Sequence, residues 1–366
     1  AYPGYIEIMA LTKELMIKIK ELTLESAVVC QFDLSLRIAE QLSAQHFQRI
    51  PRVLAHQQQS ASAKMEAVHL SCLQAHLSRC NIAAKVKSIG GGAMQIRFTL
   101  PAAPPTVAII MPTRDGGKHL HKAVISVLTH THDSQFTLIL IDNGSSDLAT
   151  LAQLQEYAQD RRCTVIRDPR PFNFSELNNH AVAQTDAEII CLLNDDVEVI
   201  DRDWLADMVA AALQAHIGAV GARLWYPDGR LQHGGVIMGY GGGAGHARKF
   251  YRRPDENSLD YSAVIQEFSS ITAACLVVRR AHFIAVGGLD ELNFPVNFND
   301  VDFCLKLREL GYHNLYVPTA ELWHHESLTR GVDKSPAQRL RFANEVACLQ
   351  KRWAKWIAND PAYNPN

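Results

Sequence analysis

The chain has 366 residues, of which 47% are hydrophobic and 20% are charged, and its formal net charge is −2. This balance predicts a folded protein of about two domains and excludes the strongly basic surface typical of nucleic-acid binding. Eight cysteines without a CxxC pair, no apolar run near the ~18 residues of a membrane span, and an N-terminus unlike a signal peptide predict a soluble cytoplasmic protein.

The N-terminal segment contains a repeat of a later one. The stretch "FDLSLRIAEQ…FQRIPRVLAHQ" (32–57) runs parallel to "VDFCLKLREL…LYVPTAELWHH" (301–325). In this alignment Asp33 matches Asp302, and His56 matches His324. The alternative is an amphipathic helix followed by an unrelated turn.

A linker is predicted at "TLPAAPPTVAIIMP" (99–112), where four prolines separate two differently patterned regions. Before it, residues 62–82 predict a helix and 83–100 a short connector containing β-structure. We therefore expect a small, mostly helical N-terminal region (1–104) and one large domain (105–366).

Apolar strands alternate with amphipathic helices after the linker. Fully apolar strands in this alternation favour an α/β fold with a mainly parallel sheet covered by helices on both faces. The predicted strands are 107–111, 136–142, 163–168 and 188–194, and the helices that follow them are 118–130, 147–159, 175–185 and 203–216.

Polar residues follow three of these strands. They are Thr113 and Arg114 after the first, Asp142 after the second, and the run 194–196 (Asn-Asp-Asp) after the fourth. Turn residues are polar in any protein, so each cluster alone has a structural explanation. Because ligands bind beyond the carboxyl ends of parallel strands, the three together favour a nucleotide and a cation at this edge.

Two later clusters also carry chemistry. "NFNDVDFCLKLRELGY" (297–312) places Asp300 and Asp302 at the start of an amphipathic helix, where capping is the structural explanation. "ELWHHESLTRG" (321–331) combines two histidines with an arginine, and an imidazole with a distant carboxylate can complete a divalent-cation site. The segment "GYGGGAGH" (239–246) lacks the spacing of a dinucleotide-binding loop and predicts a flexible loop near an acceptor.

Taken together, these pieces resemble the family 2 glycosyltransferases with the GT-A fold, especially bacterial enzymes that build cell-surface polysaccharides. The resemblance covers residues 105–366. It rests on ten pieces in the expected order: "VAIIMPTRDGG", "LILIDNGSSD", "PFNFSELNNHAV", "LLNDDVEVI", "VGARLWYPDGRLQHGGV", "SSITAACLVVRR", "VGGLDE", "NFNDVDFCLKLRELGY", "LWHHESLTRG" and "DPAYNPN".

The resemblance implies a donor site and a metal site. Asp196 and His324 would hold Mn²⁺ or Mg²⁺ against the diphosphate of a nucleotide-sugar, UDP- or dTDP-linked, with His325 a less secure ligand. Asn194 departs from the family's DxD pattern, which moves the metal to Asp196. The residues implied in nucleotide-sugar binding are Pro112, Thr113, Arg114, Asp142, Asn178, Asn194, Asp195 and Arg330.

The resemblance also implies a general base. Asp300 would deprotonate an acceptor hydroxyl as it attacks the anomeric carbon, with inversion. Thr272, Ala273 and Ala274 would lie near the sugar and acceptor, and Asp302 would cap or orient the helix. The acceptor would be a saccharide or a lipid-linked sugar, which would bring the protein to the inner face of a membrane as a peripheral protein.

Two other functions stay open at this point. A non-catalytic scaffold that binds nucleotide or glycan would suit residues 1–104, which resemble the end of a second, truncated or degenerate glycosyltransferase domain. A nucleotidyltransferase would share the sheet, and "PTRDGGK" partly matches its signature loop, but that class has no role for the 297–312 and 321–331 clusters.

Overall fold

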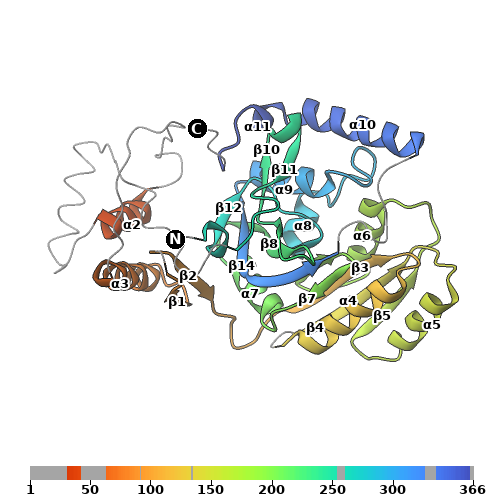
Figure 1. Ribbon diagram of the computed structural model, residues 1–366, viewed down its shortest axis with the longest axis horizontal. Coiled ribbons are helices and arrows are strands. Elements are labelled where there is room, and N and C mark those ends of the chain that lie inside the picture. The colour runs from red at the N-terminus through yellow and green to blue at the C-terminus, as the bar shows by residue number, and fades with distance from the viewer. Residues whose placement is uncertain are drawn as a thin grey trace. The chain divides into compact units, whose positions relative to one another are not determined.

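A computed structural model describes residues 31–42, 63–90, 92–132, 135–253, 260–325 and 335–362. The described residues form two compact units. One holds the residues up to Thr99 together with 260–264, and the other holds the remainder (Figure 1). His56, the N-terminal counterpart of His324, lies outside the described residues.

The N-terminal unit pairs two helices with a β-hairpin. Its elements are α2 (Gln31–Gln41), α3 (Ala63–Arg79), β1 (Ala84–Ser88) and β2 (Met94–Phe98), with β1 antiparallel to β2. Phe32, Leu73, Leu77 and Met94 form its apolar core. The predicted helix over 62–82 and the β-containing connector are therefore confirmed.

The large unit is built on a ten-stranded sheet. Its strand order is β12-β14-β8-β13-β6-β3-β4-β5, with β7 paired to β14 and β9 paired to β8. The strands are β3 (Thr106–Thr113), β4 (Gln135–Asp142), β5 (Cys163–Arg167), β6 (Ile189–Leu193), β7 (Val197–Val199), β8 (Ile217–Trp225), β9 (Leu231–His233), β12 (Gln266–Phe268), β13 (Cys275–Arg279) and β14 (His313–His324).

The half of the sheet formed by β6, β3, β4 and β5 is wholly parallel, as the apolar runs predict. Register places Thr113 directly opposite Asp142 at the carboxyl ends of β3 and β4. The polar residues that follow these strands therefore meet at one edge of the sheet. The other half is mixed, since β13 runs antiparallel to both of its neighbours while β8 and β14 are parallel.

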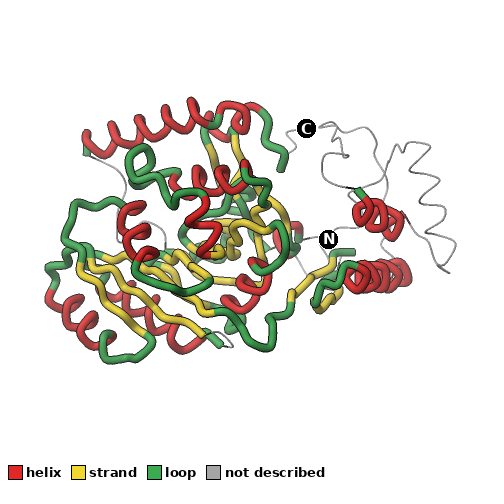
Figure 2. The backbone as a smooth tube through the Cα atoms, turned by 180° about the vertical axis from the view of Figure 1, so that it is seen from behind, coloured by secondary structure: helices red, strands yellow, loops and turns green. Residues whose placement is uncertain are grey.

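Helices lie on both faces of this sheet (Figure 2). Leu177 of α6 (Phe174–Ala183), Phe283 of α8 (Arg280–Ala285) and Phe303 of α9 (Asn299–Glu309) share one core cluster with residues of β3, β4, β6 and β13. On the other face α7 (Trp204–Ala212) packs against β8, β13 and β14. Helix α4 (Gly117–His130) follows β3, and α5 (Leu148–Tyr157) follows β4. The predicted α/β fold, with a mainly parallel sheet half and helices on both faces, is thus confirmed.

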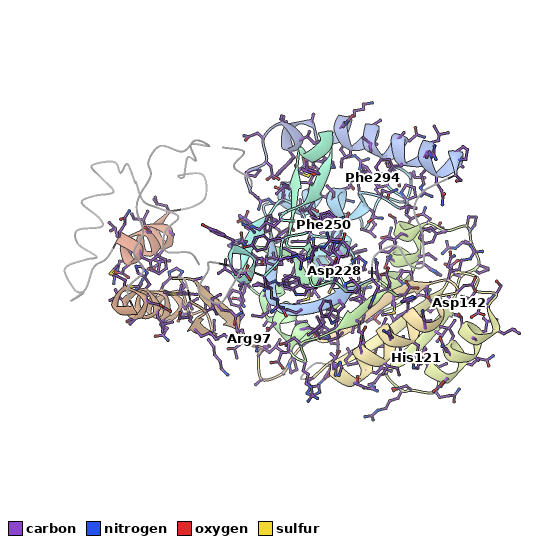
Figure 3. All side chains as sticks on the ribbon, viewed as in Figure 1. Arg97, His121, Asp142, Asp228, Phe250 and Phe294 are labelled. Carbon is purple, nitrogen blue, oxygen red and sulfur yellow. The ribbon has the colours of Figure 1, made fainter. Side chains whose placement is uncertain are left out.

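The C-terminal helices close the unit beside a small hairpin. Helix α10 (Pro336–Arg352) and α11 (Ala354–Ala358) pack with β10 (Val236–Met238) and α9 around Phe294 (Figure 3). Strand β10 pairs with β11 (Ala244–His246), so the segment 239–246, predicted as a flexible loop, instead forms the turn and second strand of a short hairpin. Within the described part of the chain, none of the helices combines the length and apolar character needed to cross a membrane.

Candidate active site

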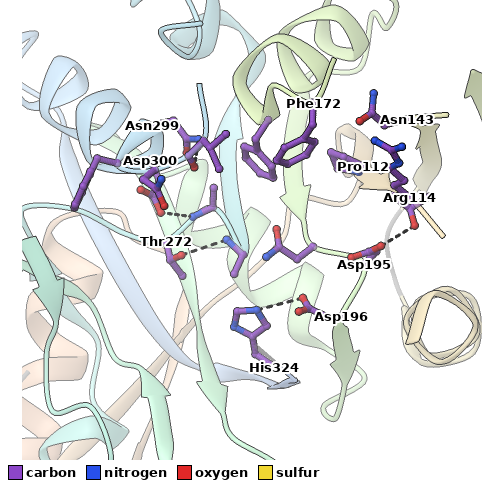
Figure 4. Close-up of a pocket in the computed structure, with 18 of the residues that line it drawn as sticks. Pro112, Arg114, Asn143, Phe172, Asp195, Asp196, Thr272, Asn299, Asp300 and His324 are labelled. Carbon is purple, nitrogen blue, oxygen red and sulfur yellow. Dashed lines mark hydrogen bonds and ion pairs between the residues drawn. The ribbon is translucent and has the colours of Figure 1, made fainter. Parts of the chain in front are cut away.

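A cavity of about 580 Å³ opens at the carboxyl edge of the parallel strands. It brings together residues from β3, α6, β9, β11, α9, β14 and α10 and from the loop that follows β6 (Figure 4). The predicted site residues that line it are Pro112, Thr113, Arg114, Asn194, Asp195, Asp196, Thr272, Ala273, Ala274, Asp300 and His324.

Asp196 and His324 meet on one side of the cavity. Asp196 Oδ1 lies 3.3 Å from His324 Nε2, and both side chains are about 95% buried. Burial alone would raise the pKa of Asp196, but the contact with His324 outweighs it and the pKa lies below the ordinary value.

This pair fits a divalent cation. Two ligands at right angles around a cation with bonds of about 2.1 Å lie about 3 Å apart. Asp196 Oδ1 is buried and faces His324 Nε2 at 3.3 Å, so a carboxylate oxygen and a ring nitrogen are directed at each other at this spacing. A carboxylate and an imidazole held in this way are suitable ligands for Mn²⁺.

Asp195 is held in place by the first strand. Thr113 Oγ1 donates a hydrogen bond of 2.6 Å to Asp195 Oδ2. Gly116 makes room for this contact, because a Cβ at that position would lie 2.7 Å from Thr113 Oγ1 and 3.0 Å from Asp195 Oδ2. A side chain at position 116 would therefore disturb the contact between Thr113 and Asp195.

Asp300 lies in the first turn of α9, on another wall of the cavity. Its Oδ2 accepts a hydrogen bond of 3.0 Å from Ala273 N, and its Oδ1 accepts one of 2.8 Å from Val301 N. Burial outweighs these hydrogen bonds and raises the pKa of Asp300 above the ordinary value. A carboxylate with a raised pKa is a stronger base once it is ionised.

Two predicted donor-site residues do not line the cavity, and a third lies outside the described residues. Asp142 is 98% buried, and its carboxylate accepts hydrogen bonds from Arg167 and from Ser145 N. Asn178 is fully buried in α6 and donates to Phe174 O at 2.7 Å. Arg330 lies outside the described residues.

Two other candidates have structural contacts. His325 Nε2 lies 3.2 Å from Glu198 Oε2, and its backbone N donates to Asp196 O at 2.9 Å. Asp302 is fully buried and accepts hydrogen bonds from Arg352 and from Trp353 Nε1, which ties α9 to the end of α10.

The cavity also contains residues that were not assigned individually to the site from the sequence, although several lie in segments quoted for it. They are Asn143, Phe172, Phe174, Gln232, His246, Val296, Asn297, Phe298, Asn299 and Phe342. Phe172 and Phe174 lie in "PFNFSELNNHAV" and Gln232 in "GRLQHGGV", two of the pieces that carry the resemblance. Their positions in these pieces could have identified them as site residues, whereas nothing in the sequence around Phe342 on α10 pointed to the cavity.

Comparisons with known proteins find one family model that matches within the large unit. Residues 108–283 match the family model "Glycosyl transferase family 2". The chain is 43% identical over 346 residues to an uncharacterized protein y4gI of Sinorhizobium fredii, covering 92% of this chain and 38% of the relative. It is 32% identical to the O-antigen biosynthesis protein RfbC of Myxococcus xanthus, covering 91% of this chain and 26% of the relative. The chain thus spans less than two fifths of the length of either protein.

A third relative and two solved structures extend the likeness. The N-acetylglucosaminyl-diphospho-decaprenol L-rhamnosyltransferase of Mycobacterium tuberculosis is 28% identical, over 69% of this chain and 85% of the relative. GalNAc-T7 with UDP, GalNAc and Mn²⁺ gives a TM-score of 0.57 at 16% identity, over 74% of this chain and 52% of that one. The mannosyltransferase PcManGT from Pyrobaculum calidifontis, with GDP-Man and Mn²⁺, gives a TM-score of 0.51 at 17% sequence identity. The alignment covers 82% of this chain and 78% of that one. At these identities the structures show the fold.

Proposed function

Because this chain contains a glycosyl transferase family 2 domain with the GT-A fold, we propose that it is an inverting, metal-dependent glycosyltransferase. It transfers a sugar from a nucleotide-sugar to a saccharide or lipid-linked acceptor in surface polysaccharide synthesis. One observation carries the proposal: Asp300 and the Asp196–His324 pair line the same cavity, although they come from different elements.

The donor is held at the carboxyl edge of β3 and β6. Asp196 and His324 would hold the divalent cation, which neutralises charge on the departing diphosphate. Arg114 is exposed at the cavity and supplies a cation for phosphate oxygens. Thr113, Asn194 and Asp195 line the same cavity and would bind the ribose and the sugar.

Asp300 performs the proton transfer. Its carboxylate takes the proton of an acceptor hydroxyl while that oxygen forms a bond to the anomeric carbon. The bond from this carbon to the diphosphate breaks, and the diphosphate leaves with the electron pair. Attack from the face opposite to the leaving group inverts the configuration, so one carboxylate suffices and no covalent sugar–enzyme intermediate is formed.

The relatives support the choice of pathway and acceptor. The Myxococcus xanthus relative is named for O-antigen biosynthesis, and the Mycobacterium tuberculosis relative for transfer of L-rhamnose to a lipid diphosphate. Acceptors of this kind are surface-glycan precursors, and a lipid-linked one would require this protein to work at a membrane surface.

Calorimetric titration tests the donor site. We expect one of UDP, dTDP, GDP and CDP to bind in the presence of Mn²⁺ and to bind far more weakly without it. Asp196→Ala should lose the part of the nucleotide affinity that depends on Mn²⁺. Asp186 is an exposed carboxylate outside the cavity, and Asp186→Ala should bind nucleotide like the wild type. Folded wild-type protein that binds no nucleotide would contradict the proposal and favour the scaffold function.

A further inference from the structure

Three side chains that can bind a metal ion lie together in the N-terminal unit. They are Glu40 near the end of α2, His76 in the last turn of α3, and Cys80 directly after α3. Their ligand atoms all lie within 4.8 Å of one another, and among the described residues no other three His, Cys, Asp or Glu side chains meet this distance. None of the three lines the active-site cavity, so the proposed transfer reaction leaves this cluster without a role.

Helix α3 brings the histidine and the cysteine to the same side. His76 and Cys80 are four residues apart, and Cys80 N donates to His76 O at 3.0 Å, so the helical turn continues through Cys80. His76 Nδ1 lies 3.8 Å from Cys80 Sγ and 2.8 Å from Glu40 Oε1. One ring nitrogen therefore faces both of the other ligand atoms, one on its own helix and one on α2.

These separations fit a tetrahedral zinc ion. Bonds of about 2.1 Å to nitrogen and oxygen and about 2.3 Å to sulfur place ligands at the tetrahedral angle about 3.4 Å (N to O) and about 3.6 Å (N to S) apart. The side chains would thus shift by about half an ångström from their separations of 2.8 Å and 3.8 Å. Cys80 is exposed, and Glu40 and His76 are partly exposed, so this shift is possible and an ion can enter from solvent.

Arg79 also binds the carboxylate of Glu40. Its Nη2 donates to Oε1 at 2.7 Å, and its Nε donates to Oε2 at 2.9 Å. A carboxylate offers about four lone pairs, so Glu40 can keep Arg79 and bind a metal through the lone pair of Oε1 that His76 now uses. The ion takes the place of the proton in the hydrogen bond between His76 and Glu40. Arg79 then orients the ligating carboxylate, as hydrogen-bonding partners of metal ligands commonly do.

The charges balance once the thiol is ionised. A Zn²⁺ ion with one carboxylate and one thiolate ligand carries no net charge, and Asp33 Oδ1 lies 3.7 Å from the Arg79 guanidinium and offsets its charge. Burial, followed by the nearby Glu40 carboxylate, raises the pKa of the Cys80 thiol above its ordinary value. The metal-free thiol therefore keeps its proton at neutral pH, and binding of the cation must release it.

A metal at this position would tie the ends of α2 and α3 together. The described core of the unit is small and consists of Phe32, Cys72, Leu73, Leu77 and Met94. Small units that bury few apolar side chains are commonly stabilised by a structural metal ion. A cross-link between the two helices would add to the contacts that this core supplies.

We propose that Glu40, His76 and Cys80 form a structural Zn²⁺ site that cross-links α2 to α3, with water as the fourth ligand. The thiolate favours zinc over the hard cations Mg²⁺ and Mn²⁺. The site is independent of the proposed function, which places its cation at Asp196 and His324.

Titration of the whole, metal-free protein with Co²⁺, a spectroscopic substitute for Zn²⁺, tests the ligands. We expect a thiolate-to-Co²⁺ charge-transfer band that Zn²⁺ removes, and Cys80→Ser should abolish it. His76→Phe and Glu40→Gln should each weaken Zn²⁺ binding at least about tenfold, the loss at the upper end of that for supporting residues of metal sites being about 100-fold. Cys348→Ser, at a partly exposed cysteine outside the cluster, should keep the band, and so should Asp196→Ala.

Protection of the thiol provides a second measurement on the wild type. Zn²⁺ should slow alkylation of Cys80 by iodoacetamide at least about tenfold, because a metal-bound thiolate is shielded from the reagent. The protection should be absent in His76→Phe. Absence of a charge-transfer band, or a band that persists in Cys80→Ser, would overturn the proposal. Should Cys80→Ser fail to fold, unchanged alkylation of wild-type Cys80 in the presence of Zn²⁺ would overturn it equally.

Discussion

Helices α2 and α9 make the same contacts in two different units. Each contains a buried aspartate followed one turn later by a cation: Asp33 with Arg37 at 2.7 Å, and Asp302 with Lys306 at 3.5 Å. Each aspartate also pairs with the last residue of a 17-residue helix. Arg79 ends α3 and lies 3.7 Å from Asp33, and Arg352 ends α10 and lies 2.7 Å from Asp302.

The helices differ two residues earlier. Asp300 lies in the cavity, whereas its counterpart Gln31 is an exposed amide that cannot act as a base at neutral pH. The shared aspartate thus connects one helix to another, and our proposal assigns the chemistry to Asp300, which α2 does not share. This comparison supports our proposal that residues 1–104 resemble the end of a second glycosyltransferase domain that lacks its base.

The largest loss of activity is expected at Asp300, the carboxylate that α2 does not share. Asp300→Asn should lower kcat by about 10² to 10⁴, because the acceptor hydroxyl loses its general base. Gln31→Ala, at the matching position of α2, should leave kcat unchanged. Steady-state transfer assays with the donor identified by titration measure both. A kcat for Asp300→Asn within tenfold of wild type would contradict the role of Asp300.

Removing the shared aspartate from α9 should cost stability. Asp302→Ala leaves the Arg352 and Trp353 donors without their acceptor in a buried site. Because Arg352 is 33% exposed and keeps its ion pair with Asp290, we expect the lower end of the range for broken buried pairs, about 3 kcal/mol. Urea denaturation measures this loss. The folded fraction should retain its kcat if the role of Asp302 is structural.

The pH dependence should report Asp300. Because burial raises the pKa of this carboxyl group, the fraction in the ionised, basic form falls at a higher pH than for an ordinary aspartate. We expect kcat/KM to decline tenfold per pH unit below that raised pKa, and the residual activity of Asp300→Asn to lack this decline. A wild-type profile that stays flat down to the ordinary aspartate pKa of about 4 would contradict the assignment.

The smallest effect is expected in α2. Asp33→Ala removes ion pairs whose cationic partners are partly exposed, and Arg79 keeps its 2.7 Å contact with Glu40. The free energy of unfolding should fall by about 1 kcal/mol, with no change in kcat. A loss of unfolding free energy as large as that of Asp302→Ala would contradict this expectation. It would mean that the aspartate contacts stabilise the two units equally.

The parallel half of the fold could be predicted from the sequence because each strand is a short apolar run followed by a helix. The antiparallel placement of β13 could not, since "CLVV" would look the same in either direction. Strand direction there depends on which neighbours the chain reaches, and that depends on tertiary packing.

Some residues of the site could likewise be predicted from local sequence, and others could not. Asp195, Asp196 and Asp300 follow or open regular elements and could be placed from local pattern. Asp142 follows the same pattern, yet Arg167 and Ser145 N already bind its carboxylate. His246 enters the cavity only through the pairing of β10 with β11, which no spacing in the sequence specified.

One contact links the cavity wall to the far end of the chain. Asp360 accepts hydrogen bonds from Met238 N at 2.5 Å and from Ser269 Oγ at 2.6 Å, so the strand paired with the His246 strand is anchored by a residue 122 positions later. During synthesis at about 5–20 residues per second, the hairpin would wait on the order of ten seconds for this anchor. The sheet and the Asp196 loop can form earlier. We therefore expect this hairpin to be fixed only after the sheet has formed, so that completion of the cavity lags behind folding of the sheet during synthesis.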